Sequence, residues 1–400
     1  MTQISERIKA IVADNIRDFE LISDYIFNNP ELGEEEVKAA KYLTEYLKTQ
    51  GFTVSFPVEE MPTAFVAEYG NKEAAHFTIG FPAEYDALPG YGPNGEPAHA
   101  CGHNWISATM CGCGVVLSKL AEELGLVVKV IGTPAEESTG GKYNLCQVGA
   151  FDDCDVVLQA HLAEASCLET KTLAMDSLEF SYYGKASHAA QFPEQGINAL
   201  DGVLHLFSGI NSLRQHVRSD ARIHGIITHG GEAPNIVPDF AQCQISVRAL
   251  DRKYMREVQE KVIRIAEGAA LIPGAKMEYR HYENPYDDIR NNKELIACVQ
   301  KNLTECGIKD FVPGYEYLTP GSSDLGNVSY ICPTLYFEVD PEGEYTCVVH
   351  DPSALKIVNS EAAYRKMEQV IEGFSLTAVE LCQDSELMSR MKKEFEEGIC

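Results

Sequence analysis

The sequence predicts an α/β fold: a larger α/β domain with a central, mostly parallel sheet, interrupted by a smaller α+β domain. Short apolar runs alternate with helical segments up to about residue 173, which indicates strands joined by crossover helices. This pattern is replaced near residue 174 and returns after Pro285. The length of 400 residues also exceeds the roughly 150 residues of an average domain, so more than one domain is expected.

The larger domain is expected to begin with helical segments and to continue with alternating strands and helices. Leu43 and Leu47 share one face of a helix that ends at Gly51. Another helix is expected from about Ile106 to Leu124. The last helix spans about Ser360–Cys382, and we expect the acidic tail beyond it to be partly frayed. The expected strands are the runs FTVSF, TAFVAEY, HFTIGFPAE, VVKVIGT and DVVLQAH.

The smaller domain follows the order β-α-β-β-α-β. Its helices are expected over Ala199–Val217 and Tyr254–Ala270, and its strands are the runs SLEFSYYGKASH, ARIHGIITHGG, FAQCQISVRALD and AKMEYRHYENPY. This order is the split βαβ, or ferredoxin-like, arrangement. We therefore expect residues 1–173 and 289–400 to form the larger domain and residues 174–288 to form the inserted one.

The composition excludes several classes of partner. The chain carries 33 Lys and Arg against 60 Asp and Glu, a formal net charge of −27, which disfavours nucleic acid and anionic membranes. The segment MTQISERIKAIVADNIRDF is typical of an amphipathic helix rather than a signal peptide, and no apolar run approaches the ~20 residues that span a bilayer. The 13 cysteines are irregularly spaced, as expected of reduced thiols. We therefore expect a cytoplasmic protein.

Polar residues follow three of the predicted strands directly. In open α/β sheets, sites form beyond the carboxyl ends of the strands, so these residues are expected to meet at one edge. The hexapeptide HACGHN adds a cysteine and a histidine one residue apart; alone, this pair is better explained by a buried cysteine beside a capping histidine. Together the side chains include thiolate, imidazole and carboxylate, which all ligate zinc-like divalent ions. The residues are Glu84, Asp86, Cys101, His103, Glu136, Glu137 and His161.

Several motifs occur in an order that resembles metallopeptidase family 20, the superfamily of aminoacylases and glutamate carboxypeptidases. They are HACGHN, GTPAEE, GKASHAAQFPEQGINAL, GGEAPNIVPD, SVRALD, GSSDLGNVS and VVHDPSAL, and the resemblance covers roughly residues 76 to 360. The combination of EYDALPG, HACGHN and GSSDLGNVS is most similar to the branch of p-aminobenzoyl-glutamate hydrolase and β-alanyl-lysine-type dipeptidases. The resemblance implies a catalytic α/β domain interrupted by a smaller lid that also forms the dimer.

The resemblance further implies two divalent metal ions per subunit, zinc or manganese, with cobalt or nickel possible in vitro. Cys101 would bridge the two ions. His103 and Glu137 would complete the coordination of one ion, and His161 and His350 would complete the coordination of the other. Glu136 would be the general base that takes a proton from metal-activated water, and Asp86 would orient a ligand.

Residues of the inserted domain are implied to bind the substrate. His188 would reach the active site of the partner subunit in a homodimer and stabilise the tetrahedral intermediate. Asn235 and Arg248 would hold the carbonyl or the terminal carboxylate of the substrate, although an arginine on a strand can equally be a surface residue. Gly321 and Ser322 would form a substrate-binding loop after the inserted domain.

The function implied is that of a metal-dependent amidohydrolase or metallodipeptidase with a small-molecule substrate. It would cleave the amide bond of N-acyl amino acids or small dipeptides. The substrates would resemble aminobenzoyl-glutamate, or they would be amino acids that carry a β-alanyl or another aminoacyl group. Two alternatives stay open at this point. One is a metal-independent cysteine amidohydrolase that uses Cys101 as nucleophile, and the other is a non-catalytic dimeric binding protein on the same fold.

Overall fold

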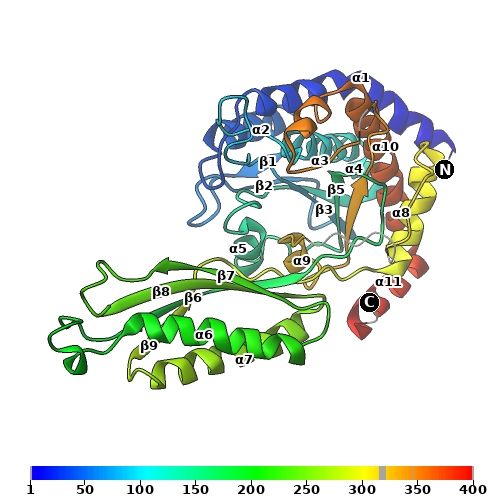
Figure 1. The fold of residues 1–400 in the computed structure, drawn as a ribbon. Helices are drawn as coiled ribbons and strands as arrows, with labels where there is room; N and C mark the ends of the chain where they lie inside the picture. The colour runs from blue at the N-terminus through cyan, green and yellow to red at the C-terminus, as the bar shows by residue number, and fades with distance from the viewer. Residues whose placement is uncertain (1, 315–320, 345, 399–400) are drawn as a thin grey trace. The chain divides into compact units, whose positions relative to one another are not determined.

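The computed structural model describes residues 2–314, 321–344 and 346–398 and divides the chain into two compact units (Figure 1). The first unit consists of Met1–Lys171, Ile289–Thr319 and Asp324–Cys400, and the second of Thr172–Asp288 and Pro320–Ser323. The first unit is built around a mixed sheet with helices on both faces, and the second around an antiparallel sheet. The fold class predicted from the sequence is therefore confirmed.

The sheet of the first unit has the strand order β1-β2-β4-β3-β5-β10. Its strands are β1 (Thr53–Ser55), β2 (Phe65–Tyr69), β3 (Phe77–Ala83), β4 (Leu126–Gly132), β5 (Val156–Leu162) and β10 (Thr334–Val339). The last four pair in parallel, whereas β1 and β2 are antiparallel to their neighbours. Every residue of β4, β5 and β10 is buried, because helices cover both faces of these strands. The carboxyl ends of the parallel strands therefore lie at one edge of the sheet.

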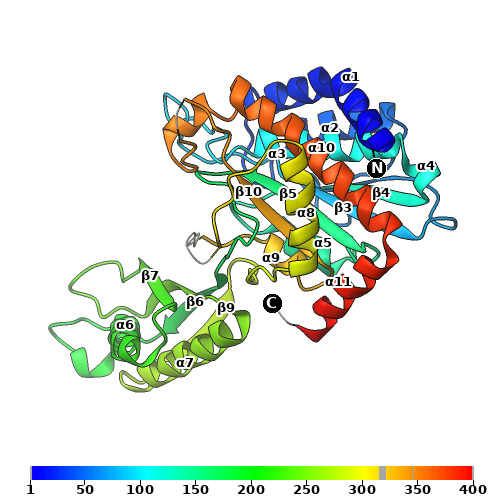
Figure 2. The ribbon, with the colours of Figure 1, turned by 90° about the vertical axis from the view of Figure 1, so that its right-hand side faces the viewer.

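Each face of this sheet packs against its own hydrophobic core, so neighbouring residues on one strand belong to different cores. Val130 packs in the large core with α3, α1 and α10, whereas the adjacent Ile131 packs with Leu145 of α5 and Leu325 of α9. The helices of this unit are α1 (Thr2–Phe27), α2 (Val37–Thr49), α3 (His103–Ser118), α4 (Ala121–Leu124), α5 (Gly141–Gln147), α8 (Lys293–Glu305), α9 (Leu325–Val328), α10 (Glu361–Gln383) and α11 (Ser385–Glu397). Figure 2 shows this arrangement from a second side.

Helix α3 lies close to the sheet because its packing face carries glycines. A methyl group on Gly114 would lie 2.3 Å from Cγ2 of Val130 on β4. Cys111 and Cys113 on the same helix are fully buried free thiols. None of the helices in the described ranges is both long and apolar enough to cross a membrane.

The second unit has the sheet order β7-β8-β6-β9, with antiparallel pairing throughout. Its elements in chain order are β6 (Ala174–Tyr183), α6 (Ala199–Leu213), β7 (Arg222–His229), β8 (Phe240–Ala249), α7 (Arg252–Leu271) and β9 (Lys276–His281). Strand β8 alternates between half-buried and buried residues along its length, because α6 and α7 cover one face of the sheet. The predicted order β-α-β-β-α-β is thus observed.

Two expectations for the helices need correction. The helix expected over Ile106–Leu124 starts earlier, at His103, and is interrupted after Ser118, so that α4 is a separate short helix. The tail beyond α10 is helical rather than frayed: it forms α11, which buries Leu387 and Met391 and is capped by the side chain of Asp384. These packing and capping contacts stabilise the tail as a helix despite its acidic residues.

Candidate metal centre

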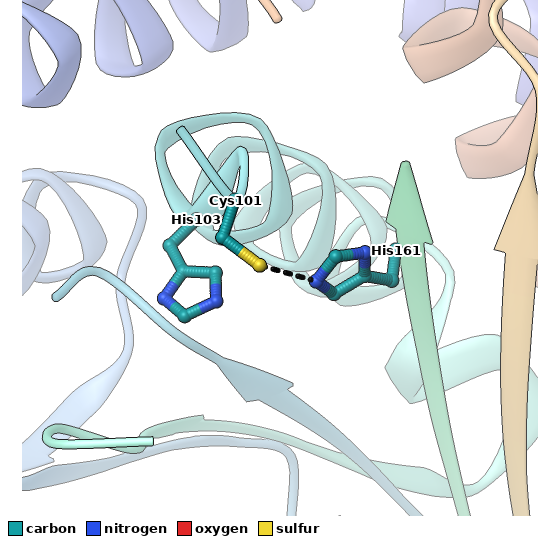
Figure 3. Close-up of side chains that lie close together, drawn as sticks. All are labelled: Cys101, His103 and His161. Atoms are coloured by element: carbon teal, nitrogen blue, oxygen red, sulfur yellow. Dashed lines mark hydrogen bonds between the residues drawn. The ribbon is translucent and has the colours of Figure 1, made fainter. Parts of the chain in front are cut away.

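A cluster of potential metal ligands lies where β5 ends and α3 begins (Figure 3). Cys101 and His103 flank Gly102, which precedes α3 with φ +83°, a left-handed conformation that glycine adopts without steric cost. A side chain at this position would also lie 3.2 Å from Cγ1 of Val358. Figure 3 shows Cys101 and His161 pointing toward each other, with 3.3 Å between Sγ and Nε2. The glycine thus allows a thiol and an imidazole to face one small space.

Cys101 belongs to two sets of potential ligands. It groups with His103 and His161 in one set and with Glu137 and His350 in the other, and the ligand atoms of each set lie within 4.8 Å of one another. The expected pairing of His103 with Glu137 also occurs, in a further set that contains Glu136, whereas His161 and His350 share no set among the described residues. Nε2 of His350 lies 3.0 Å from Oε1 of Glu137, so this histidine and this carboxylate are close enough to bind the same ion.

The two buried histidines are oriented by contacts to their other ring nitrogen. Nδ1 of His103 lies 2.8 Å from Oδ1 of Asp86, and Nδ1 of His161 lies 2.6 Å from the carbonyl oxygen of Leu162. Both contacts suit an Nδ1–H donor, which leaves Nε2 with a lone pair for a metal. Asp86 also accepts the backbone N–H of Glu137 at 2.9 Å. One carboxylate therefore positions two of the five expected ligands.

The residues of the cluster fit divalent metal ions. Among the described residues, Nε2 of His103 is a buried ring nitrogen without a hydrogen-bond partner, a costly arrangement unless another group binds it. Burial and the charges of Glu137 and Glu136 raise the pKa of the Cys101 thiol well above its usual value. A cation would compensate for this crowding of acidic groups, and the mix of S, N and O donors is typical of zinc-like ions.

Glu136 lies beside both ligand sets on the turn that follows β4. Its carboxylate is within 4.8 Å of ligand atoms of His103 and Glu137 and is partly exposed. Desolvation and the neighbouring charges of Glu84 and Glu137 raise its pKa well above the usual value. A carboxylate this close to a cluster of potential metal ligands is a candidate for proton transfer.

A buried lysine next to the cluster had no signal in the sequence. The ammonium of Lys142 on α5 lies 2.6 Å from Oε1 of Glu84 and 2.5 Å from Oδ1 of Asp324, and its side chain is fully buried. Gln159 donates a further hydrogen bond of 2.6 Å to Glu84. Burial would raise the pKa of Glu84, but the charges of Lys142 and His103 lower it to about 2. Lysine is ordinarily a surface residue, so only long-range contacts identify this one.

The expected substrate-binding residues lie in the second unit. His188 and Asn235 are exposed and adjoin each other: the N–H of Ala189 donates to the carbonyl of Asn235 at 3.0 Å. The backbone N–H groups of residues 190 and 191 lie 3.3 Å from Nδ1 of His188. These contacts suit a tautomer with the proton on Nε2, where it can be donated to another molecule.

Arg248 and the loop after residue 320 form the remaining expected group. Arg248 is half-buried on β8, and its Nη1 lies 3.3 Å from Oγ of Ser322. The carbonyl of Gly321 accepts the N–H of Leu173 at 2.9 Å. The guanidinium retains a buried Nε without a hydrogen-bond partner within the described chain, so it can bind a further acceptor.

Comparisons with known proteins indicate the same family as the sequence motifs. The profile of peptidase family M20/M25/M40 matches residues 80–374. Xaa-Arg dipeptidase of Mus musculus is 32% identical over 389 residues, which are 94% of this chain and 88% of that protein. One of the p-aminobenzoyl-glutamate hydrolase subunits of Escherichia coli (strain K12) is 35% identical over 317 residues, 76% of this chain and 65% of the relative.

Solved structures share the fold at lower identity. The aminobenzoyl-glutamate utilization protein from Klebsiella pneumoniae has a TM-score of 0.73 at 18% identity, covering 93% of this chain and 98% of its own. The YXEP protein of Bacillus subtilis, a dinuclear metal binding peptidase, has a TM-score of 0.64 at 20% identity, covering 90% and 98%.

The fold, the site and these relatives define a hydrolase that acts on peptide or amide bonds. The chain belongs to peptidase family M20/M25/M40, and the resemblance seen in its motifs is confirmed.

The network around Lys142 makes a prediction about stability. We expect Lys142→Met to lower the free energy of unfolding by about 3–5 kcal/mol, because it leaves buried carboxylates without their cation. Adding Asp324→Asn should recover part of this loss. Lys129→Met is the matched control: Lys129 is also buried, but its partner Asp153 is 46% exposed and can be solvated. Equal losses for the two lysines in urea unfolding would contradict the prediction.

Proposed function

We propose that this protein is a dinuclear metal-dependent hydrolase that cleaves the amide bond of small dipeptides or N-acyl amino acids. The observation that carries the proposal is the position of Cys101, which is shared by two ligand sets with Glu136 beside them. The relatives named as a dipeptidase and as an aminobenzoyl-glutamate hydrolase support amide substrates of this size.

Cys101 would bridge two ions, with His103 and His161 completing one site and Glu137 and His350 the other. Zinc and manganese both suit this mixture of ligands, and the order of affinities does not decide which metal a cell supplies. The bound ions would supply Lewis acidity and lower the pKa of a water molecule. Asp86 holds the ring of His103 and the backbone of Glu137, so it would preserve the geometry of both sites.

Glu136 would transfer the proton in each half of the reaction. As the water oxygen bonds to the amide carbon, the carboxylate takes the proton from that water. As the C–N bond then breaks, the carboxylic acid returns the proton to the leaving nitrogen, which departs as an amine. The position of the Glu136 carboxylate beside both ligand sets supports these two roles.

The second unit would act as a lid that binds the substrate and forms a homodimer. Arg248 and Ser322 suit a free carboxylate, because a guanidinium can bond both of its oxygens. Strand β7 is an edge strand that exposes Ile226 and Ile227, with relative exposures of 62% and 42%, and an apolar edge of this kind suits pairing with a second copy. The family resemblance implies that His188 then reaches the partner subunit's active site and that Asn235 holds the carbonyl or the terminal carboxylate of the substrate.

A cysteine hydrolase is the competing interpretation of the contact between Cys101 and His161. The separation of 3.3 Å would suit a thiol and its base. However, burial and nearby carboxylates raise the pKa of the thiol, and burial lowers the pKa of His161 to about 4. Both effects oppose formation of a thiolate by proton transfer to this imidazole. The metal mechanism is therefore favoured.

Substitution of the general base tests the mechanism. We expect Glu136→Gln to reduce kcat about 10²- to 10⁴-fold on a panel of dipeptides and N-acyl amino acids, with release of the amine as the readout. Bound metal measured by elemental analysis should be unchanged. The exposed Glu122→Gln serves as a control and should retain full activity. Equal turnover by Glu136→Gln and wild type would eliminate the mechanism.

Metal removal distinguishes the two classes of hydrolase. Treatment with EDTA or phenanthroline should abolish activity, and added zinc or manganese should restore it, because the reacting water depends on bound ions. A cysteine hydrolase would instead keep its activity in chelator and lose it to iodoacetamide alone. Elemental analysis of the active protein should find close to two metal ions per chain; active protein without metal would refute the proposal.

Mixed dimers test the role given to His188. The variants His188→Ala and Glu136→Gln should each be nearly inactive, but a mixed dimer would contain one site with both residues intact. After subunit exchange at equal amounts, about a quarter of wild-type activity is expected. Mixtures that stay as inactive as the two variants, or full activity from a monomer in solution scattering, would contradict the shared site.

A further inference from the structure

Glu36 is a fully buried carboxylate that lies outside the segment matched by the family profile. It immediately precedes α2, and its Oε1 accepts the backbone N–H of Ala135 at 2.7 Å. Its Oε2 accepts the hydroxyl of Thr63 at 2.9 Å, and the carbonyl of Thr63 in turn accepts the hydroxyl of Tyr85 at 2.6 Å. Glu36 therefore links the turn that carries Ala135 to Thr63, and Thr63 links it to Tyr85.

Ala135 has a backbone conformation that alanine rarely adopts. Its φ is +60°, in the left-handed region where the Cβ atom is crowded, and such residues persist when surrounding contacts hold them. The amide of Ala135 is held by Glu36, and its carbonyl accepts the N–H of Gly140 at 2.9 Å. Gly33 packs against the same residue: a Cβ there would lie 3.1 Å from Cα of Ala135.

The two residues after Ala135 are the proposed base and a proposed ligand. The turn is held at two backbone amides, Ala135 by Glu36 and Glu137 by Asp86, and Glu136 lies between these points. The segment that carries Glu36 also holds the Asp86 loop, since the carbonyl of Glu31 accepts the N–H of Ala87 at 2.8 Å. Loss of either contact would release one end of the turn.

We propose that Glu36 is a positioning residue: it holds Ala135 in the left-handed conformation and so aims the carboxylate of Glu136 at the metal centre. This inference rests on the proposed function of Glu136. Glu36 belongs to none of the sets of potential ligands found among the described residues, and its proposed effect passes through the backbone of the turn. An apolar side chain would remove the acceptor, and the buried amide of Ala135 would lose its partner.

The test compares three single substitutions in the metal-loaded enzyme. Glu36→Leu should lower kcat about 10- to 100-fold, because a small misplacement of a catalytic group has effects of this size. KM and the metal content should stay close to wild type. Glu36→Gln should recover most of the lost kcat, because its amide oxygen can accept the same N–H and Thr63 can accept from its NH₂ group. Glu35→Leu, one residue earlier and exposed, is the matched control.

A second-site substitution separates positioning from a general loss of structure. Adding Ala135→Gly to Glu36→Leu should raise kcat several-fold over Glu36→Leu alone, because glycine adopts positive φ without the steric penalty of a Cβ. If Glu36→Leu does not fold, Thr63→Val removes one of the two donors to Glu36 and should still lower kcat by a smaller factor at unchanged metal content.

Three results would overturn the proposal. They are a Glu36→Leu enzyme with wild-type kcat, an equal loss in Glu36→Gln, and a loss of bound metal in place of a loss of kcat. If the wild type shows metal-dependent amide hydrolysis that requires Glu136, any of these results overturns the role of Glu36 alone. If Glu136→Gln is as active as wild type, the proposed function has failed instead.

Discussion

Buried negative charge at the carboxyl edge of the sheet is the constraint on which the rest of the site depends. Carboxylates from the ends of β3 and β4 and from the start of α9 approach one another in a region largely closed to water. The oxygens of Glu84, Glu136 and Asp324 lie within 4.8 Å of one another. Like charges this close cannot all ionise without compensation, because water screens them poorly. A cation that compensates for this charge is therefore a structural requirement of the site.

The protein meets this requirement in two ways. On the side of α5, the protein itself supplies the cation: the ammonium of Lys142 contacts Glu84 and Asp324 directly. On the side of α3, the donors Cys101, His103 and Glu137 face a space that divalent ions would fill under our proposal. Glu136 lies between the two sides, and its raised pKa reflects this position. The charge of the buried lysine thus offsets part of the negative charge around the proposed base.

Backbone conformation sets the precision of the site. The left-handed Gly102 lets Cys101 and His103 face one space, and the left-handed Ala135 directs the acidic pair after β4. Glycine adopts its conformation freely, whereas alanine depends on contacts such as the one from Glu36. The N-terminal segment therefore contributes to the reaction proposed here although it supplies no ligand.

The sequence by itself determined the architecture and predicted which residues would gather at the site. Alternating apolar runs indicate the parallel sheet, the order β-α-β-β-α-β indicates the second unit, and strand-end residues such as His161 indicate the edge where a site forms. These features are local, so periodicity and motif spacing record them. Only the tertiary structure decided that Lys142 is buried between Glu84 and Asp324, that Glu36 contacts Ala135, and that His103 groups with His161. Those contacts join residues far apart in the chain, and no local pattern encodes which distant partners a folded backbone brings together.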